Sequence, residues 1–480
     1  MSSLEDRLAK LERLVEAQQA IIEAKDAEIA RLLARLEVLE RRLGENSSNS
    51  NKPPSSDGPE ARASRPSTPS GRPRDGQKGH KGHRRVLLPP ERVRSTTHCY
   101  PSKCRRCQAR LPRRPDGHPL RHQVIDTPPT AASADEYVRH RVECACGETT
   151  CGELPVGVPA HMFGPNLLAL IAVLVGDCHV SRRKVQTLLR DVHGVDVSLG
   201  ALSEAEEVIS EAVAPAVDEA TAHALAARVK HADGTTWYQA GEYRALWTLA
   251  TSAVTVFVIA TDATRATLRT WLDRVRGVLV SDRGKQFDFW TEDRRQLCWA
   301  HLIRKFASFA ERRGQVGVMG RDLLFWSRVL LRAWHRARDG TLTRSEFRAT
   351  AASLRVLIEH LLELGSASNT PGVGGACRDI LSYRAALWYF VDHPTVDPTN
   401  NHAARELRGF VLWRRSSYGS QSDRDATYAA RIKSVIQTCR KQHRPVLGYL
   451  AQACTAAYAA DRRLPCSPPG ERVPRTRSPN

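Results

Sequence analysis

Hydrophobic residues recur with alternating spacings of four and three from residue 4 to residue 43, which is the pattern of a coiled-coil seam. One set of seam positions holds most of the β-branched residues, and the other is mainly leucine with Gln18 and Lys25 as polar interruptions. The pattern predicts that residues 1–45 form a parallel two-stranded coiled coil that dimerises the chain. A single amphipathic helix lying on the protein's own body is the alternative.

The hydrophobic period ends at residue 46, and Asn, Ser, Pro and Gly become frequent. This composition predicts a disordered basic linker over residues 46–94, and we expect a disordered tail at residues 459–480. Between residues 61 and 94, ten Lys and Arg side chains stand against two acidic ones. The linker residues Lys78, Lys81, Arg84 and Arg85 are therefore candidates for contacts with nucleic-acid phosphates, unless the run is simply a solvated tail.

Residues 156–222 show helical spacing. We predict a buried helix over 167–175, a second helix that Ser181 caps and that ends at Val192, and a third from Ser198 through Ile209. The turn at Gly194 gives the spacing of a helix-turn-helix DNA-binding element. Three glutamates on the third helix suit a phosphate-facing helix poorly, so plain helical packing is the alternative.

Short strands are predicted within residues 223–312. They cover 228–238, 243–251 and 253–260, followed by a helix over 264–275, strands over 277–281 and 296–300, and a helix from residue 301. This is the order of a ribonuclease-H-like core. In that order the first and fourth strands are neighbours, which would bring Asp233 and Asp282 together at one edge of the sheet.

Two close carboxylates repel each other unless cations compensate their charge. A pair of Mg²⁺ ions supplies that charge: one ion activates the attacking oxygen and the other stabilises the leaving oxygen of a phosphoryl transfer. Asp233 and Asp282 are accordingly predicted to be catalytic metal ligands. A single aspartate in such a run is more often a strand-end or turn residue, but two at these positions are seldom accidental.

The composition indicates several modules and a polyanionic partner. The chain has 480 residues, of which 41% are hydrophobic, and its formal net charge is +20. No apolar run reaches the length of a membrane span, and the charged N-terminal segment does not resemble a signal peptide. We therefore expect a cytoplasmic, nucleoid-associated protein whose cysteines stay reduced.

Clustered cysteines in a reduced protein indicate a metal site rather than disulfides. Within residues 95–155, Cys104 and Cys107 form a CxxC pair, and Cys144 and Cys146 form a tighter CxC pair. Four thiolates from two such pairs can close a tetrahedral site for one structural zinc ion, which would replace the core that so short a segment lacks. The alternative is a loose loop with reduced thiols.

A series of motifs extends along most of the chain. They are the zipper-like start, ENSSNSNKPPSSD (45–57), GQKGHKGH (76–83), the cysteine pairs, HADGTTW (231–237), VLVSD (278–282), CWAHLIR (298–304), PTNN (398–401) and WRRSSYGSQS (413–422). Together they resemble the bacterial DDE transposases of the insertion-sequence 66 family. The family implies a ribonuclease-H-like domain with a helical insertion. Residues 313–395 fit that insertion, and residues 396–458 would complete the core with its catalytic helix.

The third acid that the resemblance implies is missing from its usual position. The family has the pattern Asn-Asn-x-x-Glu-Arg, whereas residues 400–405 are NNHAAR, so that Ala404 takes the place of the glutamate. The nearest acid, Glu406, is the candidate third catalytic ligand, but it lies about 200° further around a helix. It could serve only if the helix is shifted or unwound; otherwise it is a solvated glutamate. The family also has Glu where this chain has Gly234.

The resemblance extends to residues that would contact DNA. Arg304 lies in the CWAHLIR motif, and Arg414 and Arg415 follow the catalytic helix, where they would hold phosphates. A solvated basic face is the alternative for the last two. His301 either contacts a phosphate, orients a carboxylate or is a buried structural histidine.

These observations predict a multidomain α+β protein that acts as a DNA transposase with two catalytic Mg²⁺ ions and one structural Zn²⁺. It would bind double-stranded DNA at element ends and target as a homodimer or higher oligomer, with or without helper proteins of the same element. Ala404 favours an alternative, a catalytically impaired DNA-binding relative. A ribonuclease-H-type nuclease without strand transfer is a third hypothesis, against which the zipper, zinc module and linker argue.

Overall fold

The computed structural model describes residues 2–49, 87–114, 117, 120–125, 131–159, 161–272 and 276–460. The four basic linker residues named above, Lys78, Lys81, Arg84 and Arg85, lie outside these ranges, as do residues 461–480 of the predicted tail. The described part is a mixed α and β structure with two sheets. No helix within it is long and apolar enough to cross a membrane.

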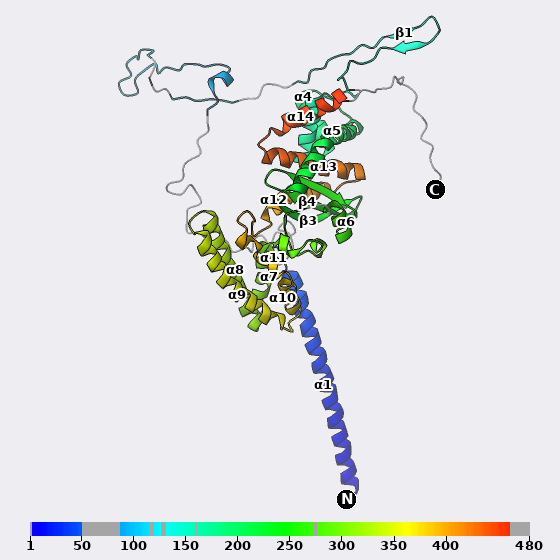
Figure 1. The fold of residues 1–480 in the computed structure, drawn as a ribbon, viewed down its shortest axis with the longest axis vertical. Helices are drawn as coiled ribbons and strands as arrows, with labels where there is room; N and C mark the ends of the chain where they lie inside the picture. Colours follow the sequence, from blue (N-terminus) through cyan, green and yellow to red (C-terminus); the bar gives the residue numbers. More distant parts are fainter. Residues whose placement is uncertain are drawn as a thin grey trace.

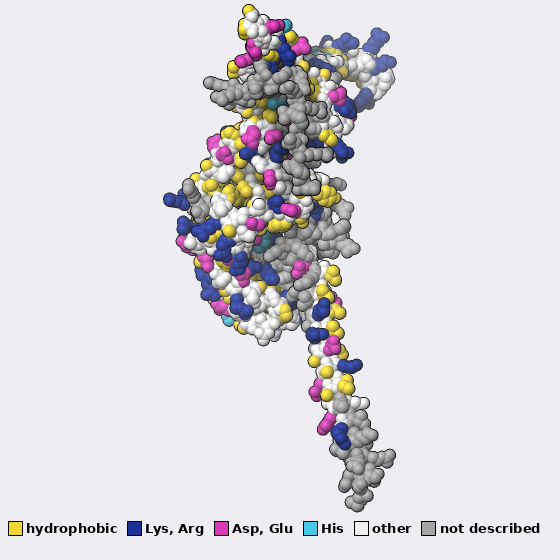
Figure 2. Space-filling view, turned by 90° about the vertical axis from the view of Figure 1, so that its right-hand side faces the viewer, with side chains coloured by type: hydrophobic (Ala, Val, Ile, Leu, Met, Phe, Trp, Pro, Cys, Tyr) yellow, Lys and Arg dark blue, Asp and Glu magenta, His cyan; other side chains and the backbone are white. Residues whose placement is uncertain are grey.

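A helix of 43 residues, α1 (Ser2–Gly44), projects from the body of the molecule (Figure 1). Its extent agrees with the segment for which the heptad pattern predicts a coiled coil. The seam residues Ile22, Ile29 and Leu36 are about half exposed, and hydrophobic side chains are visible along the projecting helix in Figure 2. The helix therefore does not pack along the protein's own body, which was the alternative interpretation.

The turn after α1 fixes the point where this helix leaves the body. Asn49 Nδ2 donates to Gly44 O at 3.0 Å and to Glu311 Oε2 at 2.9 Å, just past the end of α7 (Trp299–Ala310). The composition assigned residues 46–49 to a disordered linker. That boundary is wrong, because the Asn49 side chain is 7% exposed and joins α1 to α7.

The cysteine segment contains little regular structure among its described residues. A short 3-10 turn, η2 (Pro90–Arg92), precedes it, and β1 (Arg141–Glu143) pairs with β2 (Thr149–Cys151) as an antiparallel hairpin. Leu88 exchanges two hydrogen bonds with the Gln123 side chain, at 2.7 and 3.0 Å. Residues 87–94, which composition also placed in the linker, are thereby attached to this segment.

Four helical elements follow: α3 (Pro165–Ala172), the π-helical η3 (Val173–Asp177), α4 (Arg182–His193) and α5 (Leu199–Ala226). The third predicted helix was expected to end at Ile209 but runs to Ala226 through Pro215. It packs against α13 (Asp423–Lys441) and α14 (Val446–Ala460) in one hydrophobic core. Glu206 of α5 is buried there in an ion pair with Arg182 of α4, which explains one of the glutamates on this helix.

The central sheet has five strands in the order β5-β4-β3-β6-β7. Their bounds are β3 Val229–Gln239, β4 Glu242–Ala250, β5 Thr255–Ala260, β6 Val278–Ser281 and β7 Arg295–Leu297. β3, β4 and β5 form an antiparallel meander, whereas β6 is parallel to both β3 and β7. The predicted neighbouring of the first and fourth strands is confirmed. The last strand ends at Leu297 instead of Ala300, because Cys298 already caps α7.

Helices cover both faces of this sheet. One face packs against the end of α5 and against α6 (Arg265–Leu272), and the other packs against α12 (Asn401–Ser417) and α13. Two 3-10 turns, η4 (Lys285–Phe287) and η5 (Glu292–Arg294), connect β6 to β7. The loop after β6 and helix α12 therefore pack against opposite faces of the sheet.

Residues 313–395, which were assigned to an insertion from the sequence, are mainly helical. This segment contains α8 (Gly314–Arg338), α9 (Arg344–Ser366), α10 (Gly374–Leu381) and α11 (Arg384–Asp392), which share a hydrophobic core with α7 (Figure 1). The chain breaks at Ser382 and Tyr383 between α10 and α11. The break lets the Tyr383 side chain contact the loop after β6.

Candidate active site

Asp233 and Asp282 lie side by side at the ends of adjacent parallel strands. In the register between β3 and β6, His231 pairs with Val280, and each aspartate is two residues beyond its strand's member of that pair. Asp233 continues along β3, while Asp282 directly follows the last residue of β6. The short, fully buried β6 fixes this placement, because Val278, Leu279 and Val280 anchor it in the core.

The electrostatics of this pair are those of two carboxylates in a confined site. Burial, and then the neighbouring charge of Asp282, raise the pKa of Asp233 to about 7. The Gly234 N–H and the positive charge of Arg304 oppose this shift without cancelling it. A strongly shifted carboxyl with a like charge beside it is a recognised property of functional sites.

The hydrogen bonds of the two aspartates leave oxygens available to a ligand. Asp233 Oδ1 accepts from Gly234 N at 2.9 Å, and Asp282 Oδ1 accepts from Gly284 N at 2.9 Å. Among the described residues, no donor contacts the second carboxylate oxygen of either residue. Carboxylate oxygens are the donors that Mg²⁺ prefers, so the pair fits a magnesium site. The described residues contain no group of three or more His, Cys, Asp or Glu side chains placed to hold a metal ion.

Gly234, where the family pattern has a glutamate, faces the opposite side of β3. A Cβ atom at this position would lie 2.4 Å from the ring of Trp247 on β4. Trp247 is 3% exposed and fills the space beneath the strand. The glycine is therefore required by the packing of this chain, and no acidic side chain can take its place without moving the tryptophan.

Arg304 and His301 of α7 border the aspartate pair. His301 Nδ1 and Arg304 Nε are buried and have no hydrogen-bond partner among the described residues. Burial, and then the charge of Arg304, lower the pKa of His301 to about 4 despite the opposing effect of Asp282. At neutral pH the imidazole is uncharged, and Arg304 supplies the positive charge beside the two carboxylates.

Glu406 is held on the other side of β3. Its Oε1 lies 3.2 Å from Lys441 Nζ and 3.8 Å from His402 Nε2. Lys441 in turn donates to the carbonyl of Thr251 at 2.7 Å, in the turn between β4 and β5. Because β4 and β6 flank β3 on opposite sides, the contacts of Glu406 direct it away from Asp282.

Position 404 lies on the flank of α12 opposite to that of Glu406. The helix follows β3, since Asn400 Nδ2 donates to Ala232 O at 2.7 Å and Arg414 donates to Thr236 O further along the strand. Ala403 is buried against the sheet, Glu406 is on the flank towards β4, and Ala404 is exposed. Residues 404 and 406 are about 200° apart on a helix, so Ala404 occupies the flank away from β4.

Arg414 and Arg415 have different surroundings. Arg414 is half-buried, donates to Thr235 Oγ1 at 3.3 Å and to the Thr236 carbonyl, and burial lowers the pKa of its guanidinium. It therefore anchors α12 to β3. Arg415 is exposed and has no ion pair among the described residues.

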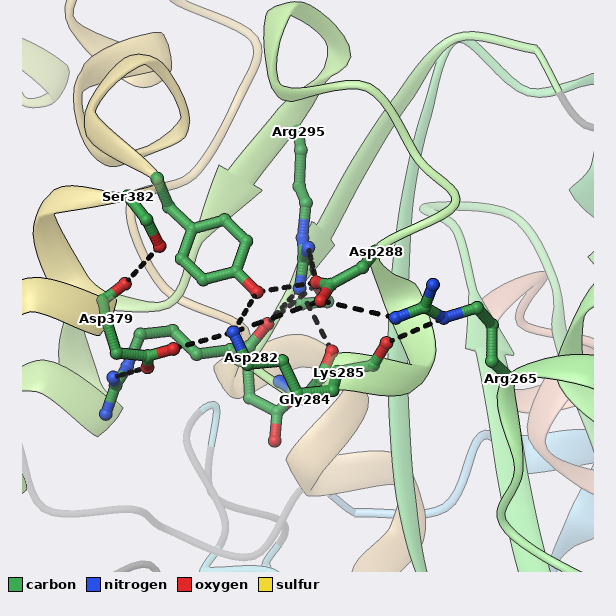
Figure 3. A network of polar contacts seen from close by, with 11 residues as sticks. Arg265, Asp282, Gly284, Lys285, Asp288, Arg295, Asp379 and Ser382 are labelled. Atoms are coloured by element: carbon green, nitrogen blue, oxygen red, sulfur yellow. Dashed lines mark hydrogen bonds and ion pairs between the residues drawn. The ribbon is translucent and has the colours of Figure 1, made fainter. Parts of the chain in front are cut away.

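A network of polar side chains supports the loop that begins at Asp282 (Figure 3). Arg295 of β7 is fully buried and donates to Asp282 O at 2.8 Å, and its guanidinium pairs with Asp288 at 3.3 Å. From the insertion, Asp379 of α10 pairs with Arg283 and Lys285. None of these supporting residues was predicted from the sequence as part of the site.

The four cysteines form two separate pairs. In each pair a backbone N–H of the second cysteine lowers the pKa of the first thiol, that of Cys107 for Cys104 and that of Cys146 for Cys144. Both thiols are therefore easier to ionise, as metal binding requires. The structure does not bring the two pairs together into a group of three or more ligands within its described residues.

Comparisons with known proteins place this site within a family. A family model described as transposase IS66 family matches residues 160–428, which include both aspartates, the insertion and α12. A second model, described as a family of unknown function (DUF6444), matches residues 5–86. A curated relative, the uncharacterized protein y4qI of Sinorhizobium fredii, is 27% identical over 162 residues. That alignment covers 33% of this chain and 30% of the relative, so the match spans less than a third of the relative's length.

Proposed function

The chain belongs to the transposase IS66 family, and from that premise we propose that it is a DNA transposase of an insertion sequence. It binds the ends of the element and carries out metal-dependent cleavage and transfer of DNA strands. The observation that carries this proposal is the pairing of Asp233 with Asp282 at the ends of β3 and β6. The strand order β5-β4-β3-β6-β7, with a helical insertion before the last helices, supports a ribonuclease-H-like core.

The proposed mechanism assigns a separate role to each residue at the site. Asp233 and Asp282 bind two Mg²⁺ ions, which would supply the charge that an in-line phosphoryl displacement requires. Arg304 contributes positive charge beside them, where a DNA phosphate would enter, and neutral His301 lines the same position. Arg415 is exposed at the end of α12 and is proposed to contact DNA phosphates, whereas Arg414 orients the helix.

A second candidate function follows from Ala404. With Glu406 bound to Lys441 on the far flank of α12, the site has two carboxylates where the family pattern has three. The chain would then be a catalytically impaired relative that still binds element ends. We propose that the natural chain has this reduced activity, because the third ligand position is occupied by a methyl group.

Other segments are proposed to assist DNA binding. The exposed seam of α1 is proposed to pair two chains, so that two element ends can be held together. Lys78, Lys81, Arg84 and Arg85 of the linker would contact phosphates without reading sequence. Such a protein would act on DNA in the cytoplasm and associate with the nucleoid.

The experiment that tests the function uses duplex DNA carrying the terminal sequences that flank the gene, together with Mg²⁺. The natural chain should bind these ends in preference to unrelated duplex DNA at physiological salt, and light scattering should find at least two chains in the complex. Efficient strand cleavage without joining to target DNA would identify a simple nuclease. Equal affinity for ends and unrelated DNA would contradict the transposase proposal.

The cysteine segment is proposed to bind one structural zinc ion through Cys104, Cys107, Cys144 and Cys146. Metal analysis of the purified chain should find one zinc per chain, and the Cys104→Ser, Cys107→Ser double variant should lose it. Cys178→Ser is the matched control, because Cys178 is an exposed free cysteine outside the segment and its loss should leave zinc unchanged. Undiminished zinc in the double variant would disprove the assignment.

A further inference from the structure

The loop that presents Asp282 is held from two directions (Figure 3). On its buried side, Arg295 Nη2 donates to Asp282 O at 2.8 Å and Arg295 Nε donates to Ser281 Oγ at 3.2 Å. These bonds fix the backbone at the end of β6. The same guanidinium donates to Gly284 O at 3.5 Å and pairs with Asp288 at 3.3 Å, and the residues that follow Asp282 also contact a different part of the molecule.

The second set of contacts comes from the helical insertion. The two carboxylate oxygens of Asp379, on α10, bind different cations of the loop: Oδ2 binds Arg283 Nη1 and Oδ1 lies 2.6 Å from Lys285 Nζ. Tyr383, at the break between α10 and α11, donates to Asp288 Oδ1 at 2.6 Å and accepts from Lys285 Nζ at 3.0 Å. The insertion therefore binds the loop through ion pairs and hydrogen bonds to Arg283, Lys285 and Asp288.

The Asp282 carboxylate is linked to these contacts through the backbone of Gly284. Its Oδ1 accepts from the N–H of Gly284, and Gly284 lies between the two residues that Asp379 binds. Asp379 also neutralises two cations that are one and three residues from Asp282. Without Asp379, the Arg283 guanidinium would lose its ion pair, and the Lys285 ammonium would keep only Tyr383 and the 3.9 Å contact with Asp288, so that both cations could turn towards the Asp282 carboxylate and compete with a metal ion for it.

We propose that Asp379 is a positioning residue for the metal site: through Arg283 and Lys285, the helical insertion sets the orientation of Asp282 and keeps it free for Mg²⁺. This inference rests on the proposed function, because it takes Asp233 and Asp282 as metal ligands. It gives the insertion a part in the active site, although none of its residues was expected there. A shift of the insertion against the core would change the metal site directly.

The test measures Mn²⁺ binding by calorimetry or paramagnetic resonance in the full chain, with Mn²⁺ as a probe for Mg²⁺. Asp379→Asn removes the charge but keeps the side-chain shape, and it should weaken binding about 10- to 100-fold, as loss of a residue that orients a metal ligand does. Asp379→Glu should restore most of the affinity. Glu363→Gln is the matched control, because Glu363 pairs with Arg384 within the insertion and has no contact with the loop.

The possible outcomes distinguish failure of the inference from failure of the proposed function. The inference is supported if Asp233→Asn abolishes Mn²⁺ binding and Asp379→Asn weakens it. In that case, hydrogen exchange of residues 282–288 should also be faster in Asp379→Asn than in Glu363→Gln. Binding that depends on Asp233 but is equal in Asp379→Asn and the natural chain overturns the inference and leaves the function intact. Absence of Asp233-dependent binding in the natural chain overturns both.

Discussion

Replacing Ala404 by glutamate should raise Mg²⁺-dependent cleavage of end-bearing DNA about a hundredfold above the natural chain. A third carboxylate on this flank of α12 would complete the ligand set begun by Asp233 and Asp282. A gain of roughly 2 to 3 kcal/mol in transition-state stabilisation, modest for a metal site, corresponds to this factor. Ala404 is exposed, so the larger side chain meets no packing obstacle. Cleavage rates on a labelled end fragment give the measurement.

Two control variants make this result specific to a carboxylate at position 404. Ala404→Gln has nearly the same shape as Ala404→Glu but lacks the charge, and it should leave cleavage at the natural level. Glu406→Ala should also change little, because the Glu406 carboxylate binds Lys441 and His402. A natural chain that is fully active, loses activity on Glu406→Ala and gains nothing from Ala404→Glu would show that Glu406 is the third ligand.

Asp233→Asn should abolish cleavage and at the same time stabilise the folded chain by roughly 2 to 4 kcal/mol at pH 8 in the absence of divalent metal. The loss of cleavage follows because an amide cannot replace the charged metal ligand. The gain in stability follows because the folded protein no longer buries an ionised carboxylate next to the negative charge of Asp282. Thermal or denaturant unfolding in a chelator, with a parallel cleavage assay, measures both effects.

The pH dependence of this gain has a definite sign. The pKa of Asp233 is raised from 3.8 to about 7 in the folded chain, so folding favours the protonated form. The natural chain therefore loses stability as pH rises from about 4 through about 7, and the asparagine variant lacks this loss. The difference between the two should be largest at pH 8 and should vanish near pH 4. A stability difference between the two proteins that is constant with pH would show that folding does not raise the pKa of Asp233.

Millimolar Mg²⁺ provides a further check on the same pair of proteins. The ion binds the charged site of the natural chain and should stabilise it, while the asparagine variant should respond much less. Mg²⁺ should therefore narrow the stability gap at pH 8.

The sheet and its aspartate pair could be predicted from the sequence because their signals are local. The buried run of Val278, Leu279 and Val280 leads through Ser281 to Asp282, and Asp233 lies within the first of the predicted strands. The rule that the first and fourth strands of this order are neighbours then placed the two side chains together. Only the ends of elements shifted, such as that of β7, where Cys298 turns the chain into α7.

Tertiary packing decided what the sequence could not. A helix stop was predicted well before Pro215, yet α5 continues through it, because Val213 and Ala220 on either side are buried and outweigh one lost hydrogen bond. The sequence does not show which flank of α12 Glu406 occupies, because that is determined by its ion pair with Lys441. That partner is on another helix, α13, and no local pattern marks it.

The contacts that support the Asp282 loop could not be predicted from the sequence for the same reason. Asp379 lies 96 residues after Arg283, with three helices between them, and a single aspartate on a helix has no special sequence context. Arg295 is fully buried in a strand, a position where arginine is rare unless it is paired. Its partner Asp288 follows Asp282 closely, and that proximity was the one clue available beforehand.

The most direct test of the central claim is cleavage of end-bearing DNA by the Ala404→Glu chain with and without Asp282→Ala. The account predicts that Ala404→Glu alone cleaves about a hundredfold faster than the natural chain, and that adding Asp282→Ala abolishes cleavage while end binding persists. Equal cleavage by the single and double variants would contradict it, because the activity would then arise from a site that does not contain Asp282.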